Sequence, residues 1–112
     1  MDNVEKGRKG EKIAQHYLKL RLYKILETNY RRKTGEIDII AKRGKYIIFI
    51  EVKYRKNADK GLPREAVTPF KQRQIKRTAE MYIVENNVKC DMRFDVIEIL
   101  GDKVEHIENA FW

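Results

Sequence analysis

The sequence predicts an α/β fold in which a mixed β-sheet is flanked by helices, in the order α-β-β-β-α-β-β. Two segments carry apolar residues at the three- or four-residue spacing of an amphipathic helix, and five shorter segments have the composition or alternation of strands. The 112 residues are enough for one compact domain with its own core. We therefore expect a single domain over residues 1–112.

The N-terminal third is predicted to form a helix and an edge strand. The helix is expected over residues 4–22. Its apolar stripe consists of Ile13, Ala14, Tyr17 and Leu18. Residues 23–30 (YKILETNY) follow as a short strand at or near a sheet edge, and the basic residues 31–35 follow as a turn.

A hairpin and a loop come next. Residues 36–42 alternate between polar and apolar, and residues 46–54 form a further strand after a tight connection at Gly44. Because residues 46–50 are apolar on both faces, this strand is expected inside the sheet. Residues 55–67 are predicted to be a polar, basic loop.

The start of the second helix is marked by Thr68 and Pro69. A threonine suits the N-cap, and a proline suits the first helical position. The helix is expected to end at about Glu85. Residues 93–100 then alternate as a strand, and residues 104–107 form a last short strand.

The composition excludes several classes of protein. The longest apolar run, residues 46–50, is far shorter than the roughly 20 residues of a membrane span. The N-terminus also lacks the apolar region of a signal peptide. The single cysteine, Cys90, excludes an internal disulfide, and no cysteine and histidine residues have zinc spacing. We therefore expect a reduced, cytoplasmic protein.

The charge of the chain is unevenly distributed. The net charge is +8, but residues 1–78 hold 22 basic and 9 acidic residues, whereas residues 79–112 hold 3 basic and 8 acidic residues. This asymmetry indicates one side that faces a polyanion and another that faces only solvent, so a nucleic-acid partner is expected. The alternative is the generally charged surface of a heat-adapted protein.

Three charged residues of the predicted hairpin are expected to lie close together. Glu51 and Lys53 share one face of their strand because side chains alternate. Folding the hairpin about Gly44 places Asp38 opposite residues 50–51, and the register that pairs Asp38 with Glu51 would bring their Cβ atoms to about 4.5–5.5 Å.

Two carboxylates at this distance repel each other, and a hard divalent cation removes the repulsion by binding both. Mg²⁺ commonly uses one or two carboxylates together with water and phosphate oxygens. A neighbouring lysine can then contact the scissile phosphate or the attacking water. The alternative is structural, because cross-strand pairs of acidic and basic residues often only stabilise a sheet.

The other residues with potential chemistry are predicted to be structural. His16 and His106 have no partner at the spacing of a catalytic or zinc site. The aromatic side chains are expected to fill or cover the core, and they are Tyr17, Tyr23, Phe49, Phe70, Tyr82 and Phe94.

The stretch GEIDIIAKRGKYIIFIEVKYR, residues 35–55, resembles the core of the YraN-like family of uncharacterised bacterial proteins, which belongs to the PD-(D/E)xK nuclease superfamily. Further motifs resemble the same family in the same order, and they are residues 7–14 (GRKGEKIA), 71–82, 93–96 (RFDV) and 106–111 (HIENAF). The resemblance covers nearly the whole chain. It implies a restriction-endonuclease-like fold and a single endonuclease-like domain.

The resemblance implies a role for each matching residue. Asp38 and Glu51 would bind the metal, Mg²⁺ or Mn²⁺, and Lys53 would form the catalytic set with them. Glu11 resembles an additional acidic metal ligand of Holliday-junction resolvases in this superfamily; the alternative is a surface residue that interacts favourably with the helix dipole. Glu36 lies on the same strand face as Asp38 and would support the metal ligands.

The basic residues near the site are candidates for contacts with nucleic acid. These candidates are Arg55 on the loop and Lys71, Gln72, Arg73, Lys76 and Arg77 on the second helix. Gln72 could equally be an ordinary exposed residue. Lys56, Lys60 and Arg64 on the loop could contact phosphate or simply face solvent.

These observations predict a divalent-metal-dependent nuclease that hydrolyses phosphodiester bonds in DNA, including structured or branched DNA. We expect DNA rather than RNA as the partner and no membrane association, and the resemblance to junction nucleases implies a homodimer. One alternative is a non-catalytic nucleic-acid-binding protein that keeps the nuclease fold. Another is a protein-interaction domain whose carboxylates pair only with lysine and arginine, which the charge asymmetry disfavours.

Overall fold

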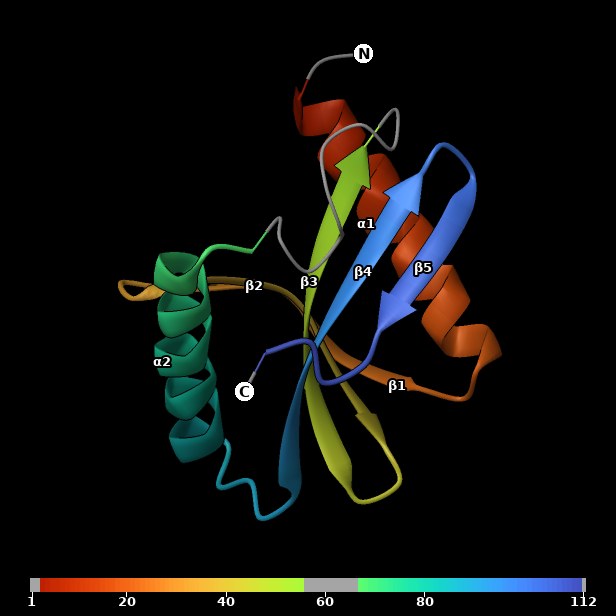
Figure 1. Ribbon diagram of the computed structural model, residues 1–112. Helices are drawn as coiled ribbons and strands as arrows, with labels where there is room; N and C mark the ends of the chain where they lie inside the picture. The colour runs from red at the N-terminus through yellow and green to blue at the C-terminus, as the bar shows by residue number, and fades with distance from the viewer. Residues whose placement is uncertain (1–2, 56–66, 112) are drawn as a thin grey trace.

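The computed structural model describes residues 3–55 and 67–111, and in this part of the chain it contains two helices and five strands in the predicted order (Figure 1). The elements are α1 (Asn3–Leu20), β1 (Lys24–Arg32), β2 (Gly35–Arg43), β3 (Tyr46–Arg55), α2 (Pro69–Glu85), β4 (Asp91–Leu100) and β5 (Lys103–Ile107). The predicted α/β fold class is therefore confirmed. No helix in these residues is long and apolar enough to cross a membrane.

The five strands form one sheet in the spatial order β1-β2-β3-β4-β5. All neighbouring strands are antiparallel except β3 and β4, which are parallel. β1 lies at one edge, as predicted, and β3 lies at the centre, as its doubly apolar sequence predicted. The connection between β3 and β4 includes α2, which is the usual way to link parallel strands.

Helices α1 and α2 cover opposite faces of the sheet (Figure 1). Ile48 and Ile50 of β3 pack in the core under α1, whereas Ile47 and Phe49 pack in the core under α2. This alternation shows why residues 46–50 are apolar at every position, because both faces of β3 are buried.

The tip of the β1–β2 hairpin packs against α2. Thr34 Oγ1 lies 2.7 Å from Thr78 Oγ1, and Arg32 Nη2 lies 2.9 Å from Glu85 Oε1. Gly35 has a φ of +148°, which residues with a side chain rarely adopt, so glycine suits this position beside Gln74 of α2. The tip of the hairpin is therefore held against α2.

Helix α2 begins at Pro69, as the sequence predicted. Thr68 is the N-cap, and its side chain accepts a hydrogen bond of 3.2 Å from the backbone N–H of Lys71. Pro69 occupies the first helical position, where no backbone donor is required. These contacts fix the first turn of α2, which carries Lys71 towards the sheet.

Several boundaries differ from the prediction by one or two residues, and two of these differences have a clear physical cause. The helix α1 ends at Leu20, since Leu22 has a φ of +68° and the N–H of Tyr23 bonds to the carbonyl of Leu18. Residues 31–35, predicted as a turn, are mostly strand: β1 continues to Arg32 because its cross-strand pairing extends to Gly35. Strand pairing and contacts with α2 outweigh the local tendency of basic residues to form a loop.

One aromatic prediction is wrong. Five of the six aromatic residues predicted to fill or cover the core are buried or half-buried, but the Phe70 side chain is 62% exposed. Phe70 lies in the first turn of α2, on the side of the helix that faces solvent. In the core itself, Phe49, Phe94 and Phe111 form a stack with successive ring centroids 5.5 Å apart.

Candidate active site

Asp38 lies where β2 separates from β3. The paired register ends with Ile39 opposite Ile50, and its continuation by one residue places Asp38 opposite Glu51. Asp38 Oδ2 accepts a hydrogen bond of 2.8 Å from the backbone N–H of Val52. The Asp38 side chain thus supplies an acceptor for β3 at the point where the ladder ends.

Glu51 is a buried carboxylate with an incompletely satisfied oxygen. Its side chain is 6% exposed, and Oε2 forms no hydrogen bond in the described part of the chain. Lys71 Nζ lies 3.7 Å from Oε2, which is ion-pair distance but longer than a hydrogen bond. A buried carboxylate oxygen in this state is costly, and a bound cation would remove much of that cost.

Burial raises the pKa of Asp38 to about 8, and the hydrogen bond and charge of Glu51 raise it in the same direction. The Val52 N–H and the positive charge of Lys71 lower the pKa, but by less. Two carboxyl groups this close share a proton when no cation is bound. A divalent cation would take the place of that proton.

Lys53 follows Glu51 by two residues on β3 and therefore lies on the same face of the sheet. Its register partner on the parallel neighbour β4 is Glu98, which is 4% exposed. Lys53 is half-buried, and no ion pair within 4.0 Å joins it to any residue of ranges 3–55 and 67–111. Its ammonium group has three donors for other partners.

Glu11 approaches the site through the close packing of α1 on β3. A Cβ on the preceding Gly10 would lie 3.3 Å from Tyr54 Cβ, so the absence of a side chain lets the helix come close. Glu11 Oε2 accepts a hydrogen bond of 3.3 Å from Asn29. Burial raises the pKa of Glu11, and the negative charges of Asp38 and Glu36 add to this although Asn29 opposes it.

Two of the three predicted metal ligands lie close together, and the third, Glu11, has a different hydrogen-bond partner. Asp38 and Glu51 face each other, whereas Glu11 is hydrogen-bonded to Asn29 and is affected by Asp38 only through its charge, which raises the pKa of Glu11. Among the described side chains, no three His, Cys, Asp or Glu residues lie close enough together to hold a metal ion. The residues present do fit Mg²⁺ or Mn²⁺ bound by two carboxylates, because such ions take most of their other ligands from water and phosphate.

Glu36 does not contact the carboxylate pair. Its Oε2 lies 3.2 Å from Arg31 Nη2 in a partly exposed ion pair across the β1–β2 hairpin. Its link to the site is electrostatic, since its charge acts on Glu11.

Some of the residues predicted to contact nucleic acid form hydrogen bonds or ion pairs within the protein, and others face solvent. Arg55 Nη2 pairs with Glu98 Oε1 at 2.8 Å, and Gln72 Nε2 donates to the Val67 carbonyl at 2.9 Å. Lys71 faces Glu51. Arg73 and Arg77 are exposed and Lys76 is half-buried, and these three stay candidates for phosphate contacts. Lys56, Lys60 and Arg64 lie outside the described residues.

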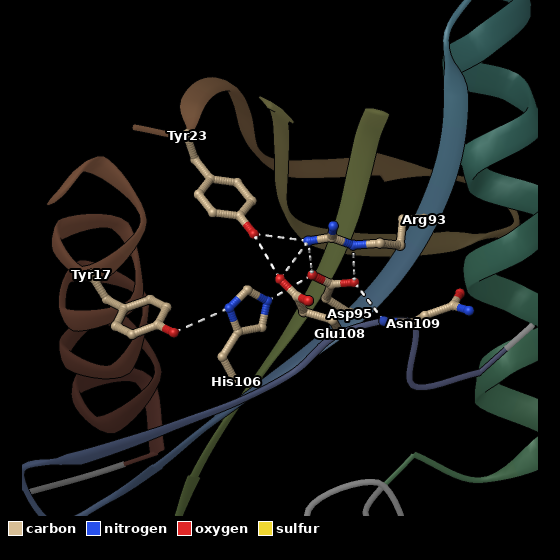
Figure 2. A network of polar contacts seen from close by, with 7 residues as sticks. All are labelled: Tyr17, Tyr23, Arg93, Asp95, His106, Glu108 and Asn109. Atoms are coloured by element: carbon tan, nitrogen blue, oxygen red, sulfur yellow. Dashed lines mark hydrogen bonds and ion pairs between the residues drawn. The ribbon is translucent and has the colours of Figure 1, made fainter. Parts of the chain in front are cut away.

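The sequence did not predict the polar network around Asp95 (Figure 2). Asp95 is fully buried on the face of β4 that α1 covers, and it accepts four hydrogen bonds. Arg93 donates to both carboxylate oxygens, through Nε at 2.9 Å and Nη2 at 2.8 Å. His106 Nε2 lies 2.6 Å from Oδ2, and the backbone N–H of Asn109 donates to Oδ1 at 2.9 Å.

Two tyrosines extend this network towards α1. Tyr17 Oη lies 3.2 Å from His106 Nδ1, and Arg93 Nη2 donates to Tyr23 Oη at 2.8 Å (Figure 2). His106 therefore has partners on both ring nitrogens, although its sequence spacing suggested none. The signal in the sequence was the pair of motifs at residues 93–96 and 106–111, which the fold brings together on adjacent strands.

Comparison with known proteins places these motifs in a family. The model of the uncharacterised protein family UPF0102 matches residues 10–99. Proteins described as UPF0102 proteins are similar over the whole length: one from Clostridioides difficile is 51% identical, over 99% of this chain and 100% of its own. One from Thermodesulfovibrio yellowstonii is 48% identical over all of both chains, and one from Geotalea uraniireducens is 47% identical over 98% of this chain and 91% of its own.

Proposed function

We propose that this chain, which belongs to the uncharacterised protein family UPF0102, the YraN-like family that its motifs resemble, is a divalent-metal-dependent nuclease acting on DNA. The observation that carries the proposal is the facing pair of Asp38 and Glu51. One oxygen of this pair, Glu51 Oε2, is buried without a hydrogen bond in the described residues, and burial together with the nearby carboxyl group of Glu51 raises the pKa of Asp38. A perturbed, under-satisfied pair of this kind is typical of a site that binds a cation.

The residues around the pair suit phosphodiester hydrolysis. Asp38 and Glu51 would hold Mg²⁺ or Mn²⁺, and a metal bound there would polarise a phosphate oxygen and lower the pKa of a bound water. Lys53, on the same strand face as Glu51, would donate to the phosphate or orient the attacking water. Lys71 balances the negative charge of Glu51 before the substrate binds.

The basic residues of α2 supply a surface for the DNA backbone. Arg73, Lys76 and Arg77 follow Lys71 along the helix, and their positions are fixed because α2 is packed on the sheet through Ile75 and Ala79. Contacts between such cations and phosphate orient a duplex without reading its sequence. The site therefore favours a nuclease that recognises the backbone or the shape of DNA, which includes structured or branched DNA.

The second candidate function is nucleic-acid binding without catalysis. The ion pair between Lys71 and Glu51 favours it, because Lys71 can compensate the charge of Glu51 without a metal. In this case binding would depend on salt, would need no divalent cation and would persist in Glu51→Gln.

Cleavage assays distinguish the two functions. Purified protein is incubated with supercoiled, single-stranded and four-way-junction DNA, with Mg²⁺, with Mn²⁺ or with EDTA. We expect metal-dependent cleavage that falls by at least about 100-fold in Asp38→Asn, Glu51→Gln and Lys53→Ala, since each removes a group that stabilises the transition state. Glu80→Gln, an exposed carboxylate of α2, is the matched control and should cleave like the wild type.

Two results would contradict the nuclease proposal. Cleavage that is unchanged in Asp38→Asn or Lys53→Ala would show that another protein or another site is responsible. Binding of DNA in EDTA by wild type and Glu51→Gln alike, with no cleavage of any substrate, would establish the binding function instead.

A further inference from the structure

Glu98 of β4 is a buried acid that the proposed mechanism does not use. Its side chain is 4% exposed and lies on the face of the sheet that α2 covers, because it alternates with Ile97 and Ile99 of the α1 side. Its register partner on β3 is Lys53. Glu98 therefore lies beside the candidate catalytic lysine, across a parallel pair of strands about 4.8 Å apart.

The two oxygens of Glu98 have different environments. Oε1 accepts a hydrogen bond of 2.8 Å from Arg55 Nη2, in an ion pair whose side chains are 13% and 4% exposed. Oε2 is buried and has no hydrogen-bond partner within residues 3–55 and 67–111. A buried carboxylate oxygen without a donor is energetically costly, so a donor that can reach it is stabilising.

Lys53 is the cation best placed to reach this oxygen. Lys71 of α2 already faces Glu51, and Arg55 is already engaged by the other oxygen of Glu98. Lys53 has a flexible four-carbon stem and forms no ion pair with the described residues. Its side chain lies on the same face of the sheet as Glu51 of β3 and Glu98 of β4. Rotation of its side chain can bring the ammonium group to Glu98.

We propose that Glu98 is a positioning residue for Lys53. One N–H of the ammonium group donates to Glu98 Oε2, which holds the lysine over the sheet between Glu98 and Glu51. The other two N–H groups stay available for a phosphate oxygen and the attacking water. The inference rests on the proposed nuclease function, and it adds a fourth residue to the set of Asp38, Glu51 and Lys53.

Glu98→Gln tests this role with little change in shape. The glutamine carbonyl can still accept from Arg55, but its NH₂ group would lie where Oε2 was and would repel the ammonium group. Because the hydrogen bond that orients the ammonium group is lost, we expect kcat to fall about tenfold while KM changes by less than about twofold. Glu98→Asp keeps the charge and should recover part of the loss, and Glu80→Gln should have no effect.

A double-mutant cycle separates positioning from a general loss of stability. If Glu98 acts through Lys53, adding Glu98→Gln to Lys53→Ala should lower kcat by less than about twofold further, since the group to be positioned is gone. A further loss of about tenfold in the double variant would overturn the proposal. Urea unfolding of each variant confirms that it is folded under the assay conditions.

A second measurement does not depend on cleavage. In protein labelled with ¹⁵N-lysine, the exchange of the Lys53 ammonium protons with water is measured by NMR without metal or DNA. We expect exchange to become about tenfold faster in Glu98→Gln, because the hydrogen bond that slows it is lost. Unchanged exchange would overturn the proposal, whereas faster exchange in a protein that cleaves no substrate would count against the nuclease function alone.

Discussion

Asp38 and Asp95 are both largely removed from solvent on strands of the same sheet, yet their surroundings are opposite. Asp95 accepts four hydrogen bonds, which come from the side chains of Arg93 and His106 and from the backbone N–H of Asn109 (Figure 2). Asp38 accepts one hydrogen bond from Val52 and faces a second carboxyl group, that of Glu51. The first aspartate has donors for both of its oxygens, whereas the second lies beside another acid, Glu51, whose Oε2 has no hydrogen bond in the described residues.

The pKa values of the two aspartates are shifted in opposite directions. Burial raises the pKa of Asp95, but the hydrogen bonds from His106, Arg93 and the Asn109 N–H lower it more, so the net pKa is below the usual value. Burial and Glu51 both raise the pKa of Asp38, to about 8. A carboxylate whose hydrogen bonds come fully from the chain is typical of a structural role, whereas one whose pKa is raised by burial and by a second acid is a candidate for function.

The largest effect is expected from removal of the satisfied carboxylate. Asp95→Ala leaves Arg93 and His106 buried without their partner, so the free energy of unfolding should fall by about 3–5 kcal/mol. Urea denaturation measures this change. Asp91→Ala, an exposed aspartate at the start of β4, should change stability by less than about 0.5 kcal/mol. Equal effects of the two variants would contradict the structural role of the network.

Removal of the Asp38 carboxylate from its pair with Glu51 should have the opposite effect on stability. Asp38→Asn keeps an acceptor for the Val52 N–H and removes the repulsion with Glu51, so stability at pH 8–9 should rise by about 1–3 kcal/mol. The same denaturation experiment, without divalent cations, gives the answer. A loss of stability at this pH would show that the pair is a structural contact and not a strained one.

The two aspartates should also give stability an opposite dependence on pH. Asp38 has a raised folded pKa, so its contribution is fully present below the ordinary value of 3.8 and is lost as the pH rises through about 8. Asp95 has a lowered folded pKa, so its contribution is present above 3.8 and is lost as the pH falls through its folded pKa. Unfolding free energies of wild type and Asp38→Asn from pH 4 to 9 should diverge with increasing pH, and parallel curves would contradict this.

Mg²⁺ should stabilise the protein through the carboxyl pair of Asp38 and Glu51. If Asp38 and Glu51 bind the ion, wild type should gain about 1.4 kcal/mol when the Mg²⁺ concentration is ten times Kd. Glu51→Gln should lose this gain, and Glu105→Gln, an exposed carboxylate of β5, should keep it. Thermal unfolding across a Mg²⁺ titration measures the effect, and an equal gain in Glu51→Gln would place the ion elsewhere.

The smallest effect is expected on the basic surface of α2. Arg77→Ala should lower the slope of log affinity for DNA against log salt by about 1, because one phosphate contact is removed. Lys103→Ala, an exposed lysine on β5, is the matched control and should leave the slope unchanged. Fluorescence anisotropy with a labelled duplex at several salt concentrations measures both slopes.

Much of the fold could be predicted because it depends on local pattern. Residues 46–50 are apolar on both faces, and β3 is indeed at the centre of the sheet. Thr68 and Pro69 mark the start of α2 through its capping chemistry. The tight connection at Gly44 placed Asp38 opposite residues 50–51, and the observed register, continued by one residue beyond the pair of Ile39 and Ile50, selects Glu51. These features need only neighbours in sequence or the two-residue period of a strand.

The partners of the charged residues could not be predicted in the same way. His106 meets Asp95 because β5 folds back on β4, and Lys71 meets Glu51 because α2 packs on the sheet. Residues 31–35 are mostly strand because they pack against α2, although their composition suggested a turn. Each of these outcomes depends on a contact between segments that are distant in sequence.

The sequence by itself determined which side chains share a face and which strand is buried, since the periods of strand and helix are local properties of the backbone. Only the tertiary structure decided how many hydrogen-bond donors each acidic group receives, because those donors come from other elements. That number distinguishes Asp95, which accepts four hydrogen bonds, from the carboxyl pair of Asp38 and Glu51, in which Glu51 Oε2 receives none from the described residues.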